Sequence, residues 1–99
     1  MKLKQFCIPN QHCFNLIKKT RRVMGDNIAL HGYLPLNELP MKMRGRIPKT
    51  EVWVREDHYD DEEKLKDIHS HEKNELTLML NKGLSYKKAH RKALRISRM

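Results

Sequence analysis

The chain has 99 residues, 38% of them hydrophobic, and a formal net charge of +9. A chain of this length is expected to form one domain (residues 1–99) with a modest core. It contains no run of eighteen apolar residues, which excludes a typical transmembrane helix. The first five residues lack the apolar segment of a signal peptide, so we expect a protein in the cytoplasm of the cell that makes it.

The positive charge is unevenly distributed along the chain. Residues 51–75 carry ten acidic and four basic side chains, whereas the remaining residues carry seventeen basic and two acidic ones. A basic surface can bind nucleic acid or an anionic membrane surface. The alternative is that the charge serves solubility alone, because the aromatic residues are scattered and form no platform on which bases could stack. The basic surface makes nucleic acid one candidate partner beside this alternative.

The N-terminal part of the chain predicts a short strand followed by a helix. Residues 1–8 are extended in character and suit an edge strand. Asn10 is a good N-cap for a helix over residues 11–24, and Gly25 is the residue type that ends helices.

Two further strands and a basic loop are expected in the middle of the chain. Residues 27–34 predict a strand, although their alternation is imperfect, and we expect His31 there to be a surface or half-buried residue without a role. The basic segment 41–46 is a candidate binding loop. Residues 50–56 alternate clearly and predict a strand. His58 follows in a turn, and we expect its side chain to be exposed rather than to bind a metal.

The two cysteines are too few for a disulfide scaffold. Thiols in the cytosol are normally reduced, with hyperthermophilic archaea as an exception. His12 lies beside Cys13, but two cysteines and one histidine make an incomplete metal site. We therefore expect Cys7 and Cys13 to be free, partly buried thiols.

The C-terminal part of the chain predicts two consecutive helices. Asp60 is a good N-cap for a helix over residues 60–82, and Glu63 stands at the spacing of a capping box. Gly83 suits the position just after a helix C-terminus. Ser85 then caps a second helix, which continues towards the end of the chain.

The first of these helices carries a glutamate in the middle of its apolar stripe. At 100° per residue, Leu65, Glu72 and Leu76 lie almost in line. An unpaired buried carboxylate is costly, so Glu72 should have a partner or a chemical role. His71 and Glu75 are one turn apart, to one side of the same stripe.

The second helix brings another histidine to the same height. Its inward face includes His90, and its outward face is basic: Lys87, Lys88, Arg91, Lys92, Arg95 and Arg98. Glu75 is eight residues before Gly83 and His90 is seven after it. In an antiparallel pair of helices both side chains would therefore lie roughly 11–12 Å from the turn.

These residues predict a metal site. His71, Glu75 and His90 are ligands of the kind that a catalytic zinc uses, with a fourth position open for water. Glu72 stands where the general base follows the first histidine of H-E-x-x-H metalloproteases, and Glu75 here replaces the second histidine. In the alternative interpretation, Glu72 pairs with a buried lysine, arginine or Tyr86, and both histidines are polar core residues.

Four segments carry a resemblance to known proteins: IPKTEVWV (47–54), HEKNEL (71–76), GLSY (83–86) and AH (89–90). They resemble a group of small archaeal and phage proteins with a zincin-like HExxE helix, over roughly the second half of the chain. The resemblance implies that His71, Glu75 and His90 are ligands and that Glu72 is the base, but it implies no particular activity. In size and composition the chain is also similar to small proteins of filamentous viruses of hot-acid archaea, which implies a host-cytoplasmic or virion-associated protein.

The fold class predicted by these elements is α+β. We expect a small antiparallel sheet of two to three strands and three helices, ending in a C-terminal helical hairpin. The predicted function is a small basic zinc-binding protein, either a metal-dependent hydrolase or an inactive relative. The alternative is a non-enzymatic interaction module whose basic surfaces bind a protein or nucleic acid. A homodimer through the exposed sheet would protect its edge.

Overall fold

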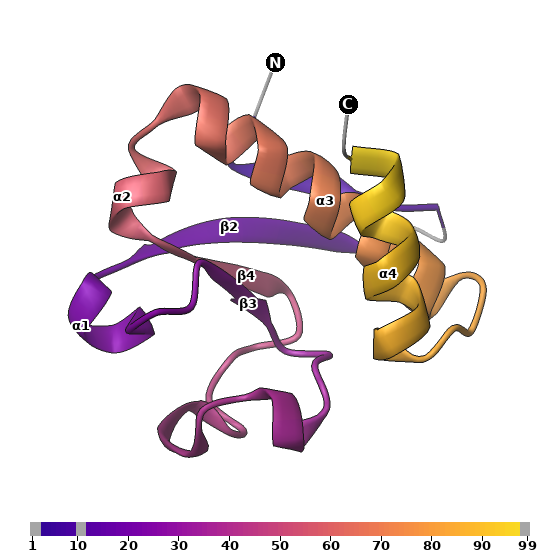
Figure 1. The fold of residues 1–99 in the computed structure, drawn as a ribbon, viewed down its shortest axis with the longest axis horizontal. Coiled ribbons are helices and arrows are strands. Elements are labelled where there is room, and N and C mark those ends of the chain that lie inside the picture. The colour runs from indigo at the N-terminus through magenta and orange to yellow at the C-terminus, as the bar shows by residue number, and fades with distance from the viewer. Residues whose placement is uncertain (1–2, 10–11, 98–99) are drawn as a thin grey trace.

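The computed structural model describes residues 3–9 and 12–97, which form a four-stranded sheet packed with helices (Figure 1). The elements in chain order are β1 (Gln5–Cys7), β2 (Cys13–Lys19), α1 (Arg21–Met24), β3 (Ala29–His31), the 3₁₀ helices η1 (Leu36–Glu38) and η2 (Met41–Met43), β4 (Glu51–Arg55), α2 (Glu56–Tyr59), α3 (Glu62–Leu80) and α4 (Tyr86–Ser97). The predicted α+β class is confirmed. None of the helices in the described part of the chain is long and apolar enough to cross a bilayer.

The sheet is mixed rather than antiparallel, and it has one strand more than the two to three expected. Its order is β1-β2-β4-β3, in which β1–β2 and β3–β4 are antiparallel and β2–β4 is parallel. Parallel neighbours need a long connection between them. Here α1, β3, η1 and η2 all lie between β2 and β4 in the chain and supply that connection. The described residues also contain four α-helices rather than three.

The helix predicted over residues 11–24 is wrong for most of its length. Residues 13–19 form β2, and only residues 21–24 are helical; Asn10 and Gln11 lie outside the described residues. The apolar residues of this segment fit either period, because Phe14 and Leu16 also alternate with Asn15 as in a strand. Pairing with both β1 and β4 stabilises the strand, and such long-range pairing is invisible to local propensity.

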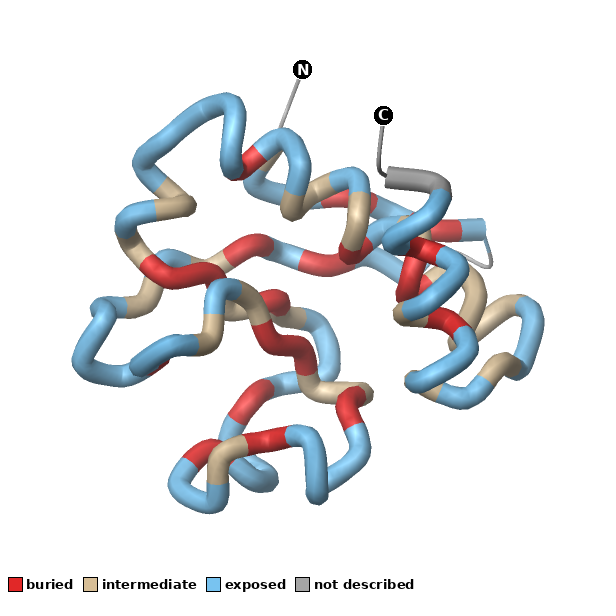
Figure 2. Tube along the Cα trace, viewed as in Figure 1, coloured by how far each residue is buried: buried red, intermediate tan, exposed pale blue. Residues whose placement is uncertain are grey.

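The main core lies between the sheet and α3. Its buried residues come from β1 and its following residue, β2, β4 and α3: Phe6, Ile8, Phe14, Leu16, Val52, Val54, Leu65 and Leu76. Buried positions follow the strands and the inner sides of the helices (Figure 2). A second cluster lies under the segment between β3 and β4, where Met43 is 2% exposed and Met41 is 79% exposed. The predicted binding loop thus turns one methionine inwards and the other outwards.

The ends of the C-terminal helices differ slightly from the sequence expectation. The N-cap of α3 is Asp61 rather than Asp60, and its Oδ1 accepts a hydrogen bond from the backbone N–H of Lys64 at 3.1 Å. The helix ends at Leu80, two residues earlier than predicted. Gly83 has φ of +68°, a conformation that few other residues adopt, and so it allows the turn into α4. The predicted pair of consecutive helices is confirmed.

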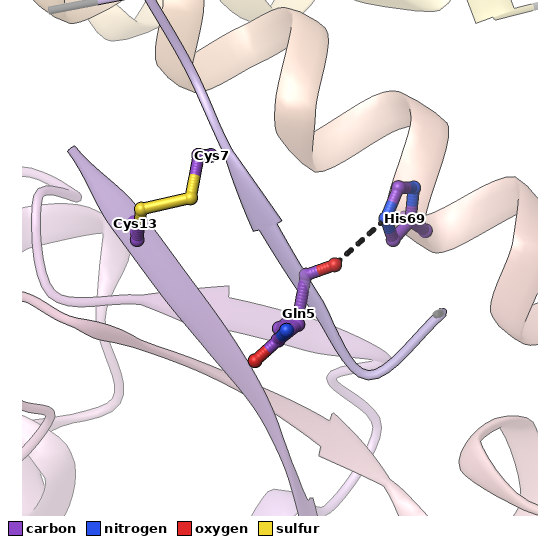
Figure 3. The surroundings of a disulfide bond; sticks show 4 residues. All are labelled: Gln5, Cys7, Cys13 and His69. Carbon is purple, nitrogen blue, oxygen red and sulfur yellow. Dashed lines mark hydrogen bonds between the residues drawn. A yellow bond between two sulfur atoms is a disulfide. The ribbon is translucent and has the colours of Figure 1, made fainter. Parts of the chain in front are cut away.

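Cys7 and Cys13 form a disulfide bond, which contradicts the expected free, partly buried thiols. The error follows from the missed strand, since the antiparallel register of β1 and β2 places the two cysteines directly opposite each other. Both residues are exposed. Figure 3 shows the bond beside Gln5, whose carbonyl accepts a hydrogen bond from His69 Nε2 at 3.1 Å and so ties β1 to α3. Oxidised cysteines leave no thiolates for a metal site with His12.

Removing the disulfide is expected to lower the free energy of unfolding by about 2 kcal/mol, because the bond closes only a short loop. Urea denaturation of the wild type with and without reductant, beside a Cys7→Ser/Cys13→Ser variant, measures this. The variant should unfold at the same urea concentration with and without reductant, and the reduced wild type should match it. A wild type that is insensitive to reductant would contradict the pairing.

Candidate metal centre

Helix α3 presents His71, Glu72 and Glu75 towards the interior. Its stripe of Leu65, Glu72 and Leu76 is buried against the sheet, as the 3.6-residue period predicts. Glu75 is also buried, with only 2% of its side chain exposed. His71 lies one turn before Glu75 at the edge of the same face, with 18% of its side chain exposed.

Helix α4 brings His90 against α3. Ser85 precedes this helix, and its Oγ accepts a hydrogen bond from the Lys88 backbone N–H at 3.4 Å, so the predicted cap is confirmed. Ala89 and Ala93 are completely buried. Such small side chains let two helices approach closely. The close approach holds the His90 ring edge-on to His71, with ring centroids 5.1 Å apart.

The three predicted ligand residues meet at one oxygen atom. Glu75 Oε2 lies 2.9 Å from His71 Nε2 and 2.9 Å from His90 Nδ1. One ligand atom from each residue falls within 4.8 Å of the other two, which is close enough to hold one metal ion. The structure thus brings together the residues that were predicted from the helical rise of about 1.5 Å per residue on either side of Gly83.

A third histidine, His31 of β3, also contacts Glu75 and was missed in the sequence. It is 1% exposed, so the expectation of a surface or half-buried residue without a role is wrong, and its Nε2 lies 3.0 Å from Glu75 Oε1. Its neighbour Gly32 packs so tightly that a Cβ there would lie 2.6 Å from the carbonyl oxygen of Ile47. The pairing of His31 with Val52, which is fully buried, marks the inward face of β3. That signal requires the sheet order, so the strand pattern alone could not provide it.

The hydrogen bonds of His31 assign it to orienting Glu75 rather than to binding metal. Its Nδ1 accepts a hydrogen bond from the Tyr33 backbone N–H at 3.2 Å, so the proton of the ring is on Nε2 and is donated to Glu75. A neutral histidine that binds a metal through Nε2 carries its proton on Nδ1 instead. His31, Glu72 and Glu75 also satisfy the distance criterion for a metal group, but this tautomer disfavours that second group.

Glu75 is held as a carboxylate. Burial pushes the pKa of its carboxyl group upward, but hydrogen bonds from the three surrounding histidines outweigh this effect and lower the pKa to about 2. The side chain therefore joins β3, α3 and α4 through a single negative charge. A negatively charged carboxylate is also the form that binds a cation.

The pKa of Glu72 is shifted in the opposite direction to that of Glu75. Burial and then the charge of Glu75 raise the pKa of the Glu72 carboxyl group well above its ordinary value of 4.5. Its Oε2 is buried without a hydrogen-bond partner among the described residues, and the nearest imidazole nitrogen, His31 Nε2, is 3.8 Å away. The lysine, arginine or Tyr86 partner of the alternative interpretation is therefore not found at this oxygen.

An open groove of about 840 Å³ leads to these side chains. His71, Glu72 and His90 form its polar lining at the metal centre, and 40% of the His90 side chain is exposed. His58 also lines the groove, where 19% of its side chain is exposed, but it belongs to neither group of potential ligands in the described part of the chain. The metal centre is thus accessible from solvent while Glu75 remains covered.

The donor atoms are of the kinds that hold a metal ion. Two imidazole nitrogens and a carboxylate oxygen are a ligand set of catalytic zinc sites, where each ligand atom lies about 2.0–2.2 Å from the ion. Two such atoms in a tetrahedral arrangement are about 3.3 Å apart. Glu75 Oε2 is 2.9 Å from each imidazole nitrogen, so an ion that replaced the two hydrogen-bonding protons would lengthen both of these distances by a few tenths of an ångström. The buried, unpartnered oxygen of Glu72 beside this point is a further feature that a cation or its bound water would satisfy.

Comparisons of the chain with protein-family models, with curated proteins and with solved structures found no match. The resemblance to small archaeal and phage proteins therefore stays a prediction.

Proposed function

We propose that this protein binds one zinc ion through His71, Glu75 and His90 and uses the centre for hydrolysis. The observation that supports the proposal most is the position of Glu75 Oε2, 2.9 Å from an imidazole nitrogen of each helix. A polar cluster that served packing alone would not need a partly exposed histidine in the lining of a groove. Zinc would supply a bound water with a pKa near 7.

The surrounding residues suit distinct tasks in such a reaction. His31 donates a hydrogen bond to the second oxygen of Glu75 and so fixes the orientation of this ligand. Glu72 lines the groove, and its raised pKa brings the carboxyl group nearer to the range in which general bases work. Its task would be to take a proton from water in the groove and to return the proton to the leaving group.

Replacing His90 by alanine is expected to weaken zinc binding at least 100-fold, because one of three protein ligands is lost. Isothermal titration calorimetry on protein made without a polyhistidine tag measures the affinity. His58→Ala is the matched control, since His58 lines the same groove but belongs to no ligand group. Equal zinc affinity in His90→Ala and wild type would remove His90 from the site.

A second candidate function is binding of nucleic acid through α4. Five exposed cations form one stripe along this helix: Lys87, Lys88, Arg91, Lys92 and Arg95. The helix contains no acidic residue, and none of the five forms an ion pair within the described part of the chain. The stripe faces away from Ala89 and Ala93, so it would be free to contact phosphates while the metal centre remains intact.

Nucleic-acid binding would show a steep salt dependence. We expect Lys88→Glu/Lys92→Glu to weaken binding of duplex DNA and to reduce the slope of log affinity against log salt by about 2, since two phosphate contacts are lost. Fluorescence anisotropy over a range of salt concentrations measures the slope. His90→Ala is the control and should leave the slope unchanged. A salt-independent affinity in the wild type would exclude this function.

A further inference from the structure

The groove beside the metal centre has an aliphatic wall. Ile28 lies just before β3 and is 42% exposed, and Leu94 of α4 is 46% exposed. Ile68 of α3 is half-buried and lines the same groove. These side chains come from three different segments of the chain but face one space. Isolated exposed aliphatic residues are ordinary, whereas several around one groove indicate a binding surface.

The wall begins directly beside the metal centre. Ile68 precedes His71 by three residues in α3, and Leu94 follows His90 by four residues in α4. Each aliphatic side chain is therefore about one helical turn, or 5.4 Å, from a histidine of the centre. Each of the two helices thus carries one aliphatic side chain of the groove close to a histidine of the centre.

The groove combines two kinds of chemistry. At the candidate metal centre it presents the imidazoles of His71 and His90 together with the carboxyl group of Glu72, which suit a carboxylate or a carbonyl oxygen. The three aliphatic side chains offer hydrocarbon to whatever extends from that oxygen, and charged residues of α3, among them Lys64, Lys66 and Asp67, line the rest of the groove. The volume of about 840 Å³ is within the range of small-molecule sites. An acyl group with an aliphatic chain combines both features.

We infer that the groove binds an aliphatic acyl group, with its carbonyl or carboxylate end at His71, Glu72 and His90 and its chain along Ile28, Ile68 and Leu94. The assignment of this acyl group as part of a substrate rests on the proposed hydrolytic function. It narrows the substrate class to esters or amides of aliphatic acids.

The test compares octanoate with acetate as probes of the zinc-free and the zinc-loaded protein, followed by NMR of methyl groups. We expect octanoate to bind about 10- to 100-fold more tightly than acetate, because its additional methylene groups leave water. The methyl signals of Ile28, Ile68 and Leu94 should shift. Leu94→Asp should remove the preference for octanoate, whereas Leu36→Asp, at another exposed leucine outside this groove, should keep it.

Equal affinities for the two probes, methyl shifts confined to other parts of the protein, or an unchanged preference in Leu94→Asp would overturn the inference. Zinc affinity measured on the same samples separates this result from failure of the proposed function. Zinc binding without a preference for octanoate would leave the metal centre and remove the acyl groove. A preference for octanoate without zinc binding would leave the groove and remove the zinc centre.

Discussion

Replacing Glu75 by glutamine is expected to abolish zinc binding and to lower the free energy of unfolding of the metal-free protein by roughly 3 kcal/mol at pH 7. Glu75 is the common acceptor for His31, His71 and His90. Glutamine preserves the shape of the side chain but removes the negative charge. Its amide group also places a donor where the carboxylate accepted hydrogen bonds.

The pH dependence of this loss follows from the lowered pKa of Glu75. In the unfolded chain the carboxyl group has its ordinary pKa of 4.5, and in the folded protein the pKa is about 2. The ionised group therefore stabilises the folded protein fully above about pH 4.5, and this stabilisation is lost as the pH falls towards 2. We expect the difference between Glu75→Gln and wild type to narrow over the same interval.

Urea denaturation at pH 7 and at pH 3 measures both effects. Glu62→Gln is a suitable control, because Glu62 is an exposed glutamate in the first turn of α3. It should change stability by no more than about 0.5 kcal/mol. A loss of unfolding free energy in Glu75→Gln at pH 7 that is no larger than in this control would contradict the stabilising role of the hydrogen bonds to Glu75.

Replacing Glu72 by methionine is expected to stabilise the metal-free protein, and increasingly so at higher pH. Burial raises the pKa of the Glu72 carboxyl group, so the folded protein holds a proton that the unfolded chain releases above pH 4.5. The folded state therefore loses stability by about 1.4 kcal/mol per pH unit between 4.5 and the pKa of folded Glu72. Methionine fills a similar volume without a charge or an unpartnered oxygen.

The same substitution separates stability from function. Glu72→Met should retain zinc affinity, since the three ligands are unchanged, but should lose hydrolysis of an aliphatic ester. Thermal unfolding at pH 5 and pH 8 measures the gain in stability, with Glu62→Gln again as the control. A variant that is less stable than wild type at pH 8, or whose advantage does not grow between pH 5 and pH 8, would contradict the raised pKa of Glu72 in the metal-free protein.

The candidate metal site was predictable to the extent that its residues lie in one helical hairpin. The position of Glu72 in the stripe of α3 and the distances of Glu75 and His90 from Gly83 follow from helix geometry alone. Local capping also placed the start of α4 at Ser85. These features depend on residues close together in the chain, where the period of the sequence carries the information.

The features that were not predicted from the sequence depend on contacts between distant parts of the chain. Strand β2 exists because β1 and β4 pair with it, and the disulfide follows from the register of that pairing. His31 reaches Glu75 across 44 positions of sequence, and its inward orientation depends on β3 pairing with β4. Nothing in the residues around His31 indicates that strand pairing. The contact of this third histidine with Glu75 could therefore be identified only in three dimensions.

The most direct test is a crystal structure of the zinc-loaded protein with anomalous scattering measured at the zinc edge. We predict one anomalous peak about 2.0–2.2 Å from His71 Nε2, His90 Nδ1 and a carboxylate oxygen of Glu75, with His31 still hydrogen-bonded to the other oxygen. A peak elsewhere, or no peak at saturating zinc with Glu75 still 2.9 Å from both imidazole nitrogens, would contradict the assignment of a metal centre.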